Sequence, residues 1–411
     1  MLDFALLYGP VVRRPMTGMR LGRRPLMLLI LLLSMFGPLS TDMYLSGLPV
    51  MMVDFRTTES VMNMSLYLFM LVLSVSILVL GPISDKYGRR NVLMSSMALY
   101  AASNVACCFT DDVHVFIALR MVQAFGGGGA MTTAFALIKD CFDGNDRSRV
   151  LSVTAAIGIL GPILAPVIGT ALINMAGWRS TFWFPAGVSA LCLLMGSLLP
   201  GYLPADRFQG SVLGSMTRLA AVTRDRNFVV FALMMCTFTG SQLAYISVSS
   251  YVYQDGFGLN PTGYSLVLAS ACVMGLVIAR ALSHAVISPR RMIACVFSLG
   301  FLSLLMMLAL ASLHWALFML SIVPCCAVTI TARSFGYGIL MSQHEGDNGS
   351  VSSVLNFTTF MFAVVGLVLA SSFPPDLFIY GVATMLAISC GVFLAGWTVI
   401  RSRGYPLKGL E

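Results

Sequence analysis

The sequence predicts an all-α polytopic membrane protein with twelve transmembrane helices. Three observations lead to this fold class. Of the 411 residues, 58% are hydrophobic and only 10% are charged, the mean hydropathy is +0.87, and long apolar segments recur along the whole chain. A soluble domain with so few charges would expose large apolar patches and aggregate.

Twelve apolar segments are long enough to cross a bilayer, whose hydrocarbon core of about 30 Å needs roughly 20 helical residues. They cover residues 25–53, 60–82, 91–110, 114–138, 149–174, 180–199, 228–253, 262–284, 291–311, 314–339, 349–372 and 377–400. The longest break divides six segments from six. We therefore expect a tail, a first bundle, a linker, a second bundle and a second tail, at residues 1–24, 25–199, 200–227, 228–400 and 401–411.

The basic residues are distributed unevenly between the two sides of the predicted membrane. An even number of helices places both termini on one side, and twenty of the 25 Lys and Arg residues fall there, whereas only Arg56 and Arg179 fall on the other side. The positive-inside rule therefore predicts that the tails and the linker are cytoplasmic. This asymmetry accounts for the net charge of +8, and we expect no nucleic-acid binding. The remaining three basic residues, Arg120, Arg280 and Arg333, lie inside predicted helices.

The cysteines and the N-terminal segment carry no sign of a cofactor site or a cleaved leader. The ten cysteines lie mostly within apolar runs and show no C-x-x-C spacing, so we interpret them as small buried hydrophobes. The first apolar segment is too long for a signal-peptide core, which favours a retained cytoplasmic tail. We expect neither a metal site nor a nucleotide-binding loop.

The first predicted helix contains a carboxylate. Asp42 is its only charge before Asp54, and an acid at the centre of a membrane helix costs about 2.5–3.5 kcal/mol on insertion scales. Such groups mark polar pathways, so we interpret Asp42 as a proton-binding residue. The alternative is that Ser40, Thr41 and Asp42 cap a half-helix after a break at Gly37-Pro38.

The fourth predicted helix contains Arg120 at a similar depth. Helix rise places Asp42 roughly 26 Å and Arg120 roughly 28 Å from the cytoplasmic ends of their helices. An unpaired Arg is costly there, so we expect Arg120 to line a polar interior together with Gln123, one helical step away. The alternative is that Arg120 snorkels to the interface. The glycine run 126–129 that follows predicts a close helix contact.

Two further stretches combine glycine with charge or proline. Between the second and third helices we expect a tight turn whose charges hold the two helix ends together, the alternative being a loop that only orients the chain. Its residues are Gly81, Asp85, Lys86, Gly88, Arg89 and Arg90. In the fifth helix, small residues predict close packing and prolines predict bending. These residues are Gly161, Pro162, Ala165, Pro166 and Gly169.

Taken together, these stretches resemble the major facilitator superfamily, within it the twelve-helix drug:proton antiporters and the Bcr/CflA-type bacterial multidrug exporters. The stretch from Gly81 to Arg90 is similar to the family's loop motif, with Lys86 where Arg is usual. Arg120, Gln123 and Gly126 fall on its R-x-x-Q-x-x-G pattern, and the fifth helix is similar to its antiporter motif.

Two weaker similarities point to the same branch. The stretch 40–45 resembles the helix-one signature, with Ser46 in place of a frequent proline. Tyr245, Ser247 and Tyr251 resemble the helix-seven pattern.

The resemblance implies a transporter, not an enzyme, with two pseudo-symmetric six-helix bundles that rock around a central cavity. It implies a monomer in the bacterial inner membrane that exports small amphipathic molecules, uses the proton gradient and needs no cofactor. Its partners would be a small-molecule substrate, protons and the lipid bilayer. The residues expected in the cavity are Asp42, Tyr44, Arg120, Gln123, Tyr245, Ser247 and Asn356.

The substrate stays open at this stage. Some multidrug members carry a second acid eight residues before the matched aspartate, where this chain has Ser34. That difference favours neutral, zwitterionic or anionic substrates, or a simpler one-proton exchange. One alternative is a dedicated exporter of a single metabolite, such as a siderophore, sugar or amino-acid derivative. Another is a non-transporting sensor of the same fold, and import remains a possible direction.

Overall fold

The computed structural model describes residues 22–142, 144–200, 222–285, 288–343, 348–404 and 407, and the secondary structure of these residues is helical. The α-helices and the short 3₁₀ or π-helical segments (η) are α1 (Arg23–Thr41), η2 (Leu45–Gly47), α2 (Leu48–Asp54), α3 (Glu59–Tyr87), α4 (Arg89–Phe109), α5 (Val113–Cys141), α6 (Gly144–Ala176), α7 (Ser180–Ser197), α9 (Arg226–Tyr251), η3 (Val252–Gly256), α10 (Pro261–Ala285), α11 (Pro289–Leu310), α12 (Trp315–Thr331), η4 (Ala332–Gly336), α13 (Tyr337–Gln343), α14 (Asn348–Ser371), η5 (Pro375–Leu377) and α15 (Phe378–Ser402).

The helices confirm the predicted fold class. Eleven helical spans within the described residues are long and apolar enough to cross a membrane. The other predicted segment, 149–174, lies within the 33-residue helix α6, whose apolar part is Leu160–Ala176. Apolar side chains at 3.6-residue spacing bury these helices against one another, as expected of an all-α bundle.

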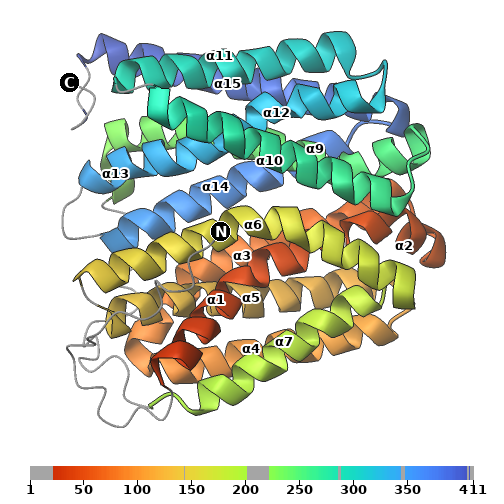
Figure 1. The fold of residues 1–411 in the computed structure, drawn as a ribbon, viewed down its shortest axis with the longest axis vertical. Helices are drawn as coiled ribbons and strands as arrows, with labels where there is room; N and C mark the ends of the chain where they lie inside the picture. The colour runs from red at the N-terminus through yellow and green to blue at the C-terminus, as the bar shows by residue number, and fades with distance from the viewer. Residues whose placement is uncertain are drawn as a thin grey trace.

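The helices gather in two sets. In Figure 1, α1 and α3–α7 occupy the lower half of the view and α9–α15 the upper half. The two sets meet where α6 packs on α10 and where α3 packs on α14. The centre of the linker that we predicted between them, residues 201–221, lies outside the described residues.

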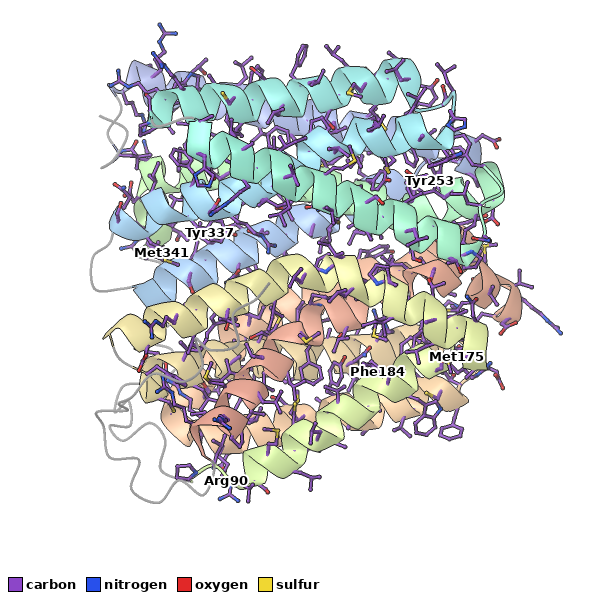
Figure 2. The ribbon with its side chains drawn as sticks, in the orientation of Figure 1. Arg90, Met175, Phe184, Tyr253, Tyr337 and Met341 are labelled. Carbon is purple, nitrogen blue, oxygen red and sulfur yellow. The ribbon has the colours of Figure 1, made fainter. Side chains whose placement is uncertain are left out.

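The bundle has two ends. We call the end where α1 begins and α15 finishes the terminal end, and the opposite end, where α2 finishes, the far end. Figure 2 shows Arg90, Tyr337 and Met341 toward the terminal end, and Met175 and Tyr253 toward the far end.

The first predicted helix, 25–53, is broken, but not where proline suggested. α1 continues through Pro38 to Thr41, and the chain then passes through Asp42 and η2 into the short helix α2. The capping alternative therefore placed the break too early. Neither η2 nor α2 receives a side-chain cap hydrogen bond, so Ser40, Thr41 and Asp42 do not act as N-caps.

The predicted two-glycine turn at 81–90 is also wrong in part. α3 stays helical through Gly81 and Pro82 to Tyr87, because a membrane helix tolerates a proline when the surrounding structure satisfies the freed backbone groups. Gly88 alone makes the turn, with φ of 95°, a conformation that glycine adopts without a Cβ clash.

The glycine run in α5 packs as predicted. A Cβ at Gly126 would clash with the Ser96 carbonyl of α4, and one at Gly128 with the Ser76 side chain of α3. The ten cysteines are free thiols, and eight of them are buried, as the sequence predicted, whereas Cys272 and Cys295 are only partly buried. These contacts fix α3, α4 and α5 close together around the site described next.

Candidate functional site

Asp42 lies at the point where the first membrane span is interrupted. Its backbone closes the last turn of α1, with the N–H donating to Pro38 O at 2.8 Å. Its side chain accepts a hydrogen bond from Thr41 Oγ1 at 2.8 Å, and the residue is only 8% exposed. Within the described residues no ion pair involves Asp42. The structure therefore contains a buried carboxyl group with a single hydroxyl donor.

Asp42 faces the second set of helices. Tyr264 and Cys272, both on α10, lie near enough to feel the charge of its carboxylate, without a hydrogen bond to it among the described contacts. The Tyr264 hydroxyl in turn contacts Ser249 Oγ of α9 at 3.1 Å. The sequence did not identify Tyr264 and Cys272 as site residues, because a tyrosine or a cysteine within an apolar run does not indicate which side chains it packs against.

Arg120 is enclosed by aromatic rings. The residue is 1% exposed, and its guanidinium carbon lies 4.5 Å from the ring centre of Tyr44, 4.4 Å from that of Phe69 and 5.8 Å from that of Phe182. Cation–π attraction stabilises a charge in this setting. The burial contradicts the snorkelling alternative. Arg120 and Asp42 do not form an ion pair with each other among the described residues.

A polar network connects Arg120 to the first helix. Arg120 Nη1 donates to Gln123 Oε1 at 2.5 Å, and Gln123 Nε2 donates to Asn104 Oδ1 at 2.8 Å. Asn104 Nδ2 donates to Tyr100 O at 2.8 Å. The Tyr100 hydroxyl contacts Ser40 Oγ at 2.7 Å, two residues before Asp42. The predicted pair Arg120 and Gln123 thus lies in one network with the Asp42 segment.

Helix α6 packs against the interruption in the first span. A Cβ at Gly161 would collide with Pro38, and a Cβ at Gly169 would overlap the Met43 carbonyl oxygen. Ala165 lies between them, buried with Met43. α6 remains one continuous helix through Pro162 and Pro166. The small residues of this stretch therefore bring α6 against the backbone beside Asp42.

Hydrogen bonds join the two sets of helices just beyond Asp42. Ser250 Oγ of α9 donates to Leu45 O at 2.7 Å, and Gln254 Nε2 of η3 donates to Ser46 O at 3.1 Å. The interrupted segment offers these carbonyls because Leu45 and Ser46 lie where the α-helical hydrogen bonding of the first span stops.

A second pair of contacts at the far end joins α6 to α10. Thr170 Oγ1 donates to Pro261 O at 3.4 Å, and Asn174 Nδ2 donates to Thr262 Oγ1 at 3.3 Å. The described side-chain hydrogen bonds between the two sets thus lie toward the far end.

The predicted residues of the second set lie apart from this network. The Tyr245 hydroxyl contacts the Tyr253 hydroxyl at 2.7 Å, and the Tyr245 ring packs on Phe318. Ser247 is fully buried, with its hydroxyl bonded to Ala244 O. Asn356 of α14 is only partly buried. No described contact brings these three residues to Asp42 or Arg120.

The stretch around Gly88 forms an ion-pair cluster within the first set. Arg89 is 5% exposed, and its guanidinium contacts Asp85 at 2.5 Å, Asp140 at 2.8 Å and Ser84 Oγ at 2.6 Å. Lys86 is exposed beside the Tyr87 ring. Arg89 therefore holds the ends of α3, α4 and α5 together. The contribution of Asp140 was missed, because it comes from a helix fifty residues away.

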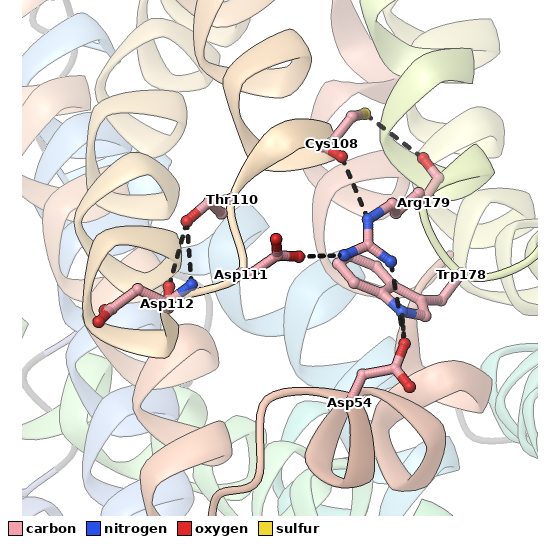
Figure 3. Close-up of polar contacts among 7 residues, drawn as sticks. All are labelled: Asp54, Cys108, Thr110, Asp111, Asp112, Trp178 and Arg179. Carbon is pink, nitrogen blue, oxygen red and sulfur yellow. Dashed lines mark hydrogen bonds and ion pairs between the residues drawn. The ribbon is translucent and has the colours of Figure 1, made fainter.

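A second cluster joins helices at the far end (Figure 3). Arg179 donates from Nε to Cys108 O at 3.1 Å and from Nη2 to Asp111 Oδ1 at 2.7 Å. The Asp54 carboxylate accepts from Trp178 Nε1 at 2.6 Å and lies 3.9 Å from Arg179 Nη1. Arg179, one of the two basic residues that the sequence placed on the side opposite the termini, thus connects the end of α2 with the loops beside α4 and α7.

A bundle of membrane-crossing helices in two sets, with buried ionisable side chains among them, is the architecture of a membrane transporter. The family model of the Major Facilitator Superfamily matches residues 30–367, and the chain belongs to this family.

Relatives by sequence are named as an MFS-type transporter and as multidrug resistance proteins. The chain is 30% identical over 249 residues to the uncharacterized MFS-type transporter YdgK of Bacillus subtilis (strain 168), a match that covers 60% of this chain and 62% of that protein. It is 26% identical over 331 residues to the multidrug resistance protein MdtL of Shigella dysenteriae serotype 1 (strain Sd197), covering 80% of this chain and 83% of that protein.

Solved structures share the fold at low sequence identity. A peptide transporter POT in complex with sulfate superposes with a TM-score of 0.74 at 12% identity, covering 93% of this chain and 96% of that one. A D-xylose-proton symporter gives a TM-score of 0.69 at 14% identity, covering 91% of this chain and 97% of that one. These likenesses support the fold and say nothing about the substrate.

Proposed function

We propose that this protein is a proton-coupled transporter that exports small amphipathic molecules by alternating access, with Asp42 as the proton-binding residue. One observation carries the proposal. The buried Asp42 carboxyl lies at the interruption of the first span, and Leu45 and Ser46, a few residues on, accept the hydrogen bonds that join the two sets of helices. The relatives named as multidrug resistance proteins support export of drug-like molecules.

The position of Asp42 links its charge to the contact between the sets. A charged carboxylate with one hydroxyl donor is costly in a dry interior, and water recovers that cost when the surroundings open. A neutral carboxyl group tolerates the enclosed position. Gain of a proton at Asp42 therefore favours closing around it, and loss of the proton favours opening.

The polar network gives the substrate a connection to the same residue. A molecule that contacts Arg120 also perturbs Gln123, Asn104 and Tyr100, and Tyr100 is bonded to Ser40. Substrate and proton thus act on one short segment of the first span. An inward proton supplies about 2.3 kcal/mol per 100 mV of membrane potential, which is enough to concentrate the exported molecule outside.

Substrate-triggered proton release from the purified protein tests this function. We would compare the wild type with Asp42→Asn, using a panel of cationic, neutral and acidic compounds and a pH-sensitive dye in weak buffer. The expected result is release in the wild type and none in Asp42→Asn, with binding retained. Asp376→Asn is the matched control, because Asp376 is exposed on η5 at the far end.

Transport in vesicles with an imposed pH gradient then gives the direction. Uptake into inverted vesicles that collapses when the gradient is dissipated is the expected outcome. Equal proton release from the wild type and Asp42→Asn would show that Asp42 has a structural role only, and the coupling proposal would fail.

A further inference from the structure

The guanidinium of Arg120 has donors that the protein does not use. Its Nη1 group is bonded to Gln123, but Nε and Nη2 are buried and have no hydrogen-bond partner. Arg120 is 1% exposed, so bulk water does not satisfy them. Unpaired donors on a buried charged group are costly, so in a native protein they call for an explanation, and a bound ligand that completes the bonding is one.

The two unused nitrogens form a single edge of the guanidinium. The Nε hydrogen and one Nη2 hydrogen point in the same direction, away from the edge that contacts Gln123. This pair is the fork that matches the two oxygens of a carboxylate with parallel N–H···O bonds. A hydroxyl or an amide oxygen engages only one member of the fork.

Aromatic rings lie close to the guanidinium of Arg120. Tyr44 and Phe69 have ring centres at 4.5 Å and 4.4 Å from its carbon. With these rings beside the guanidinium carbon, the Nε and Nη2 edge is the part of Arg120 whose donors are left for a ligand. The same rings, with Phe182 at 5.8 Å, offer an apolar neighbourhood to whatever carries the acid group.

Besides Asp42, the acid of the first span is Asp54 at its far end, which is bonded to Trp178 and lies beside Arg179. Ser34 lies eight residues before Asp42 on α1, and its hydroxyl donates to the Ile30 carbonyl of the same helix at 2.8 Å. Within the described residues Asp42 forms no ion pair with Arg120. Arg120 thus has no acidic partner among the described residues, and a carboxylate on the ligand would supply one.

From this geometry we infer that the transported molecule carries a carboxylate, which binds both Nε and Nη2 of Arg120. The inference rests on the proposed function and narrows its substrate class to amphipathic organic acids and zwitterions with a free carboxylate. The apolar part of the molecule lies beside Tyr44, Phe69 and Phe182.

Matched acid and amide pairs test the inference. We would titrate the purified full-length protein by calorimetry in chloride-free buffer with naphthalene-2-carboxylate, biphenyl-4-carboxylate and their primary amides, which differ only in the group facing Arg120. The expected result is that at least one acid binds the wild type tenfold or more tightly than its amide. If no acid binds better than its amide, the inference is overturned.

Two variants separate the fork from mere charge. Arg120→Lys keeps the charge but presents no fork, and Arg120→Gln removes both, so the preference for the acid should fall below threefold in each. Arg280→Gln, an exposed position on α10, should leave the preference unchanged. If Arg120→Lys still bound the acid tenfold or more tightly than its amide, bidentate binding would be overturned. Should the Arg120 variants fail to fold, the comparison of acid with amide in the wild type still decides the question.

A carboxylate at this edge has two possible sources, the ligand or Asp42 in another conformation. The Asp42→Asn variant distinguishes them. Preference for the acid in both the wild type and Asp42→Asn assigns the edge to the ligand. Preference that appears only in Asp42→Asn shows that Asp42 occupies the edge, and the inference fails. The proposed function is judged separately, because proton-coupled export of neutral compounds would stand if no acid were preferred.

Discussion

At the scale of single residues, Arg89 makes the densest set of charged contacts at the terminal end. Arg89→Lys keeps the charge but loses the simultaneous bonds to Asp85, Asp140 and Ser84. Loss of one partner of a buried ion pair costs about 3–5 kcal/mol. Because the Asp85 side chain is 44% exposed and therefore screened, we expect about 3 kcal/mol for Arg89→Ala and less for Arg89→Lys.

Chemical unfolding in detergent would measure this difference. The neighbouring Arg90 is the matched control, since it stands one position along the same helix and is less buried. Equal loss of stability for Arg89→Lys and Arg90→Lys would mean that the cluster around Arg89 does not hold the helix ends.

Sequence reasoning found the buried charges of the site but not their partners. Asp42 and Arg120 stand out because each is a charge inside an apolar run, and charges there are costly. Asn104 and Tyr100 complete the network from α4, and nothing in their local sequence distinguishes them from packing residues. Which polar side chains meet depends on helix adjacency, and a single sequence does not contain that information.

At the scale of helices, the contact of α6 with the first span depends on Gly169. A Cβ there would overlap the Met43 carbonyl oxygen, which belongs to the backbone and cannot rotate away. Overpacking of this kind costs about 1–3 kcal/mol. We therefore expect Gly169→Ala to lower the melting temperature and slow transport, because the segment next to Asp42 must shift.

Gly187→Ala on α7 is the control for this substitution. Nothing lies within 4 Å of a Cβ at Gly187, and alanine favours the helix by roughly 0.5–1 kcal/mol over glycine. This variant should be as stable as the wild type or more so. A Gly169→Ala protein that unfolds at the same temperature as Gly187→Ala would contradict the close packing of α6 on Met43.

The N-terminus of α5 predicts a pH dependence. The Asp112 carboxylate accepts hydrogen bonds from the backbone N–H groups of Val115 at 3.0 Å and His114 at 2.7 Å, and these bonds, the one from Val115 first, lower the pKa of Asp112 below its usual value of 3.8. A lowered pKa in the folded state stabilises the protein above the usual value, and this stabilisation is lost as the pH falls through the lowered one.

Melting temperatures measured from pH 7 down to pH 3 would show this effect. The wild type should melt above Asp112→Ala at pH 7, and the difference should shrink as the pH falls below about 4. Asp112→Asn keeps a capping oxygen without a titrating group, so its advantage over Asp112→Ala should stay constant with pH. A pH-independent difference between the wild type and Asp112→Ala would rule out the charged cap.

The helical spans themselves were predictable, whereas their interruptions were not. Apolar runs and flanking charges placed the ends of the spans to within a few residues, because the bilayer dictates a minimum length. Pro38 and Pro82 suggested breaks, yet α1 and α3 continue through both. The real interruption, between Thr41 and Leu45, contains no proline. Hydrogen bonds from α9 and η3 to the Leu45 and Ser46 carbonyls, directly after it, stabilise it.

At the scale of the whole molecule, the two sets of helices are joined by hydrogen bonds toward the far end. Ser250 and Gln254 bond the interrupted first span, and Thr170 and Asn174 of α6 bond the start of α10. The longest break between apolar segments divided the predicted helices six from six, and the family resemblance implied the two-set plan. The closed position of the far end could not be predicted, since one sequence serves all conformations of a transporter.

Alternating access requires that these far-end contacts break during each cycle. Asn174 and Thr262 are exposed side chains whose polar atoms lie 3.3 Å apart, one on α6 and the other on α10. The double variant Asn174→Cys/Thr262→Cys should therefore form a disulfide on oxidation and hold the far end closed. Transport by the oxidised protein in vesicles should fall at least tenfold, and reduction should restore it.

The single variants Asn174→Cys and Thr262→Cys, treated with the same oxidant, control for the ten native cysteines. They should transport equally well before and after oxidation, because eight of the native thiols are buried and a lone new thiol has no partner across the interface. Substrate and proton binding by the cross-linked protein should persist, since Asp42 and Arg120 are untouched by the bond. Undiminished transport through a fully cross-linked far end would show that α6 and α10 do not separate there, and the rocking of the two sets would have to be abandoned in favour of a smaller local gate.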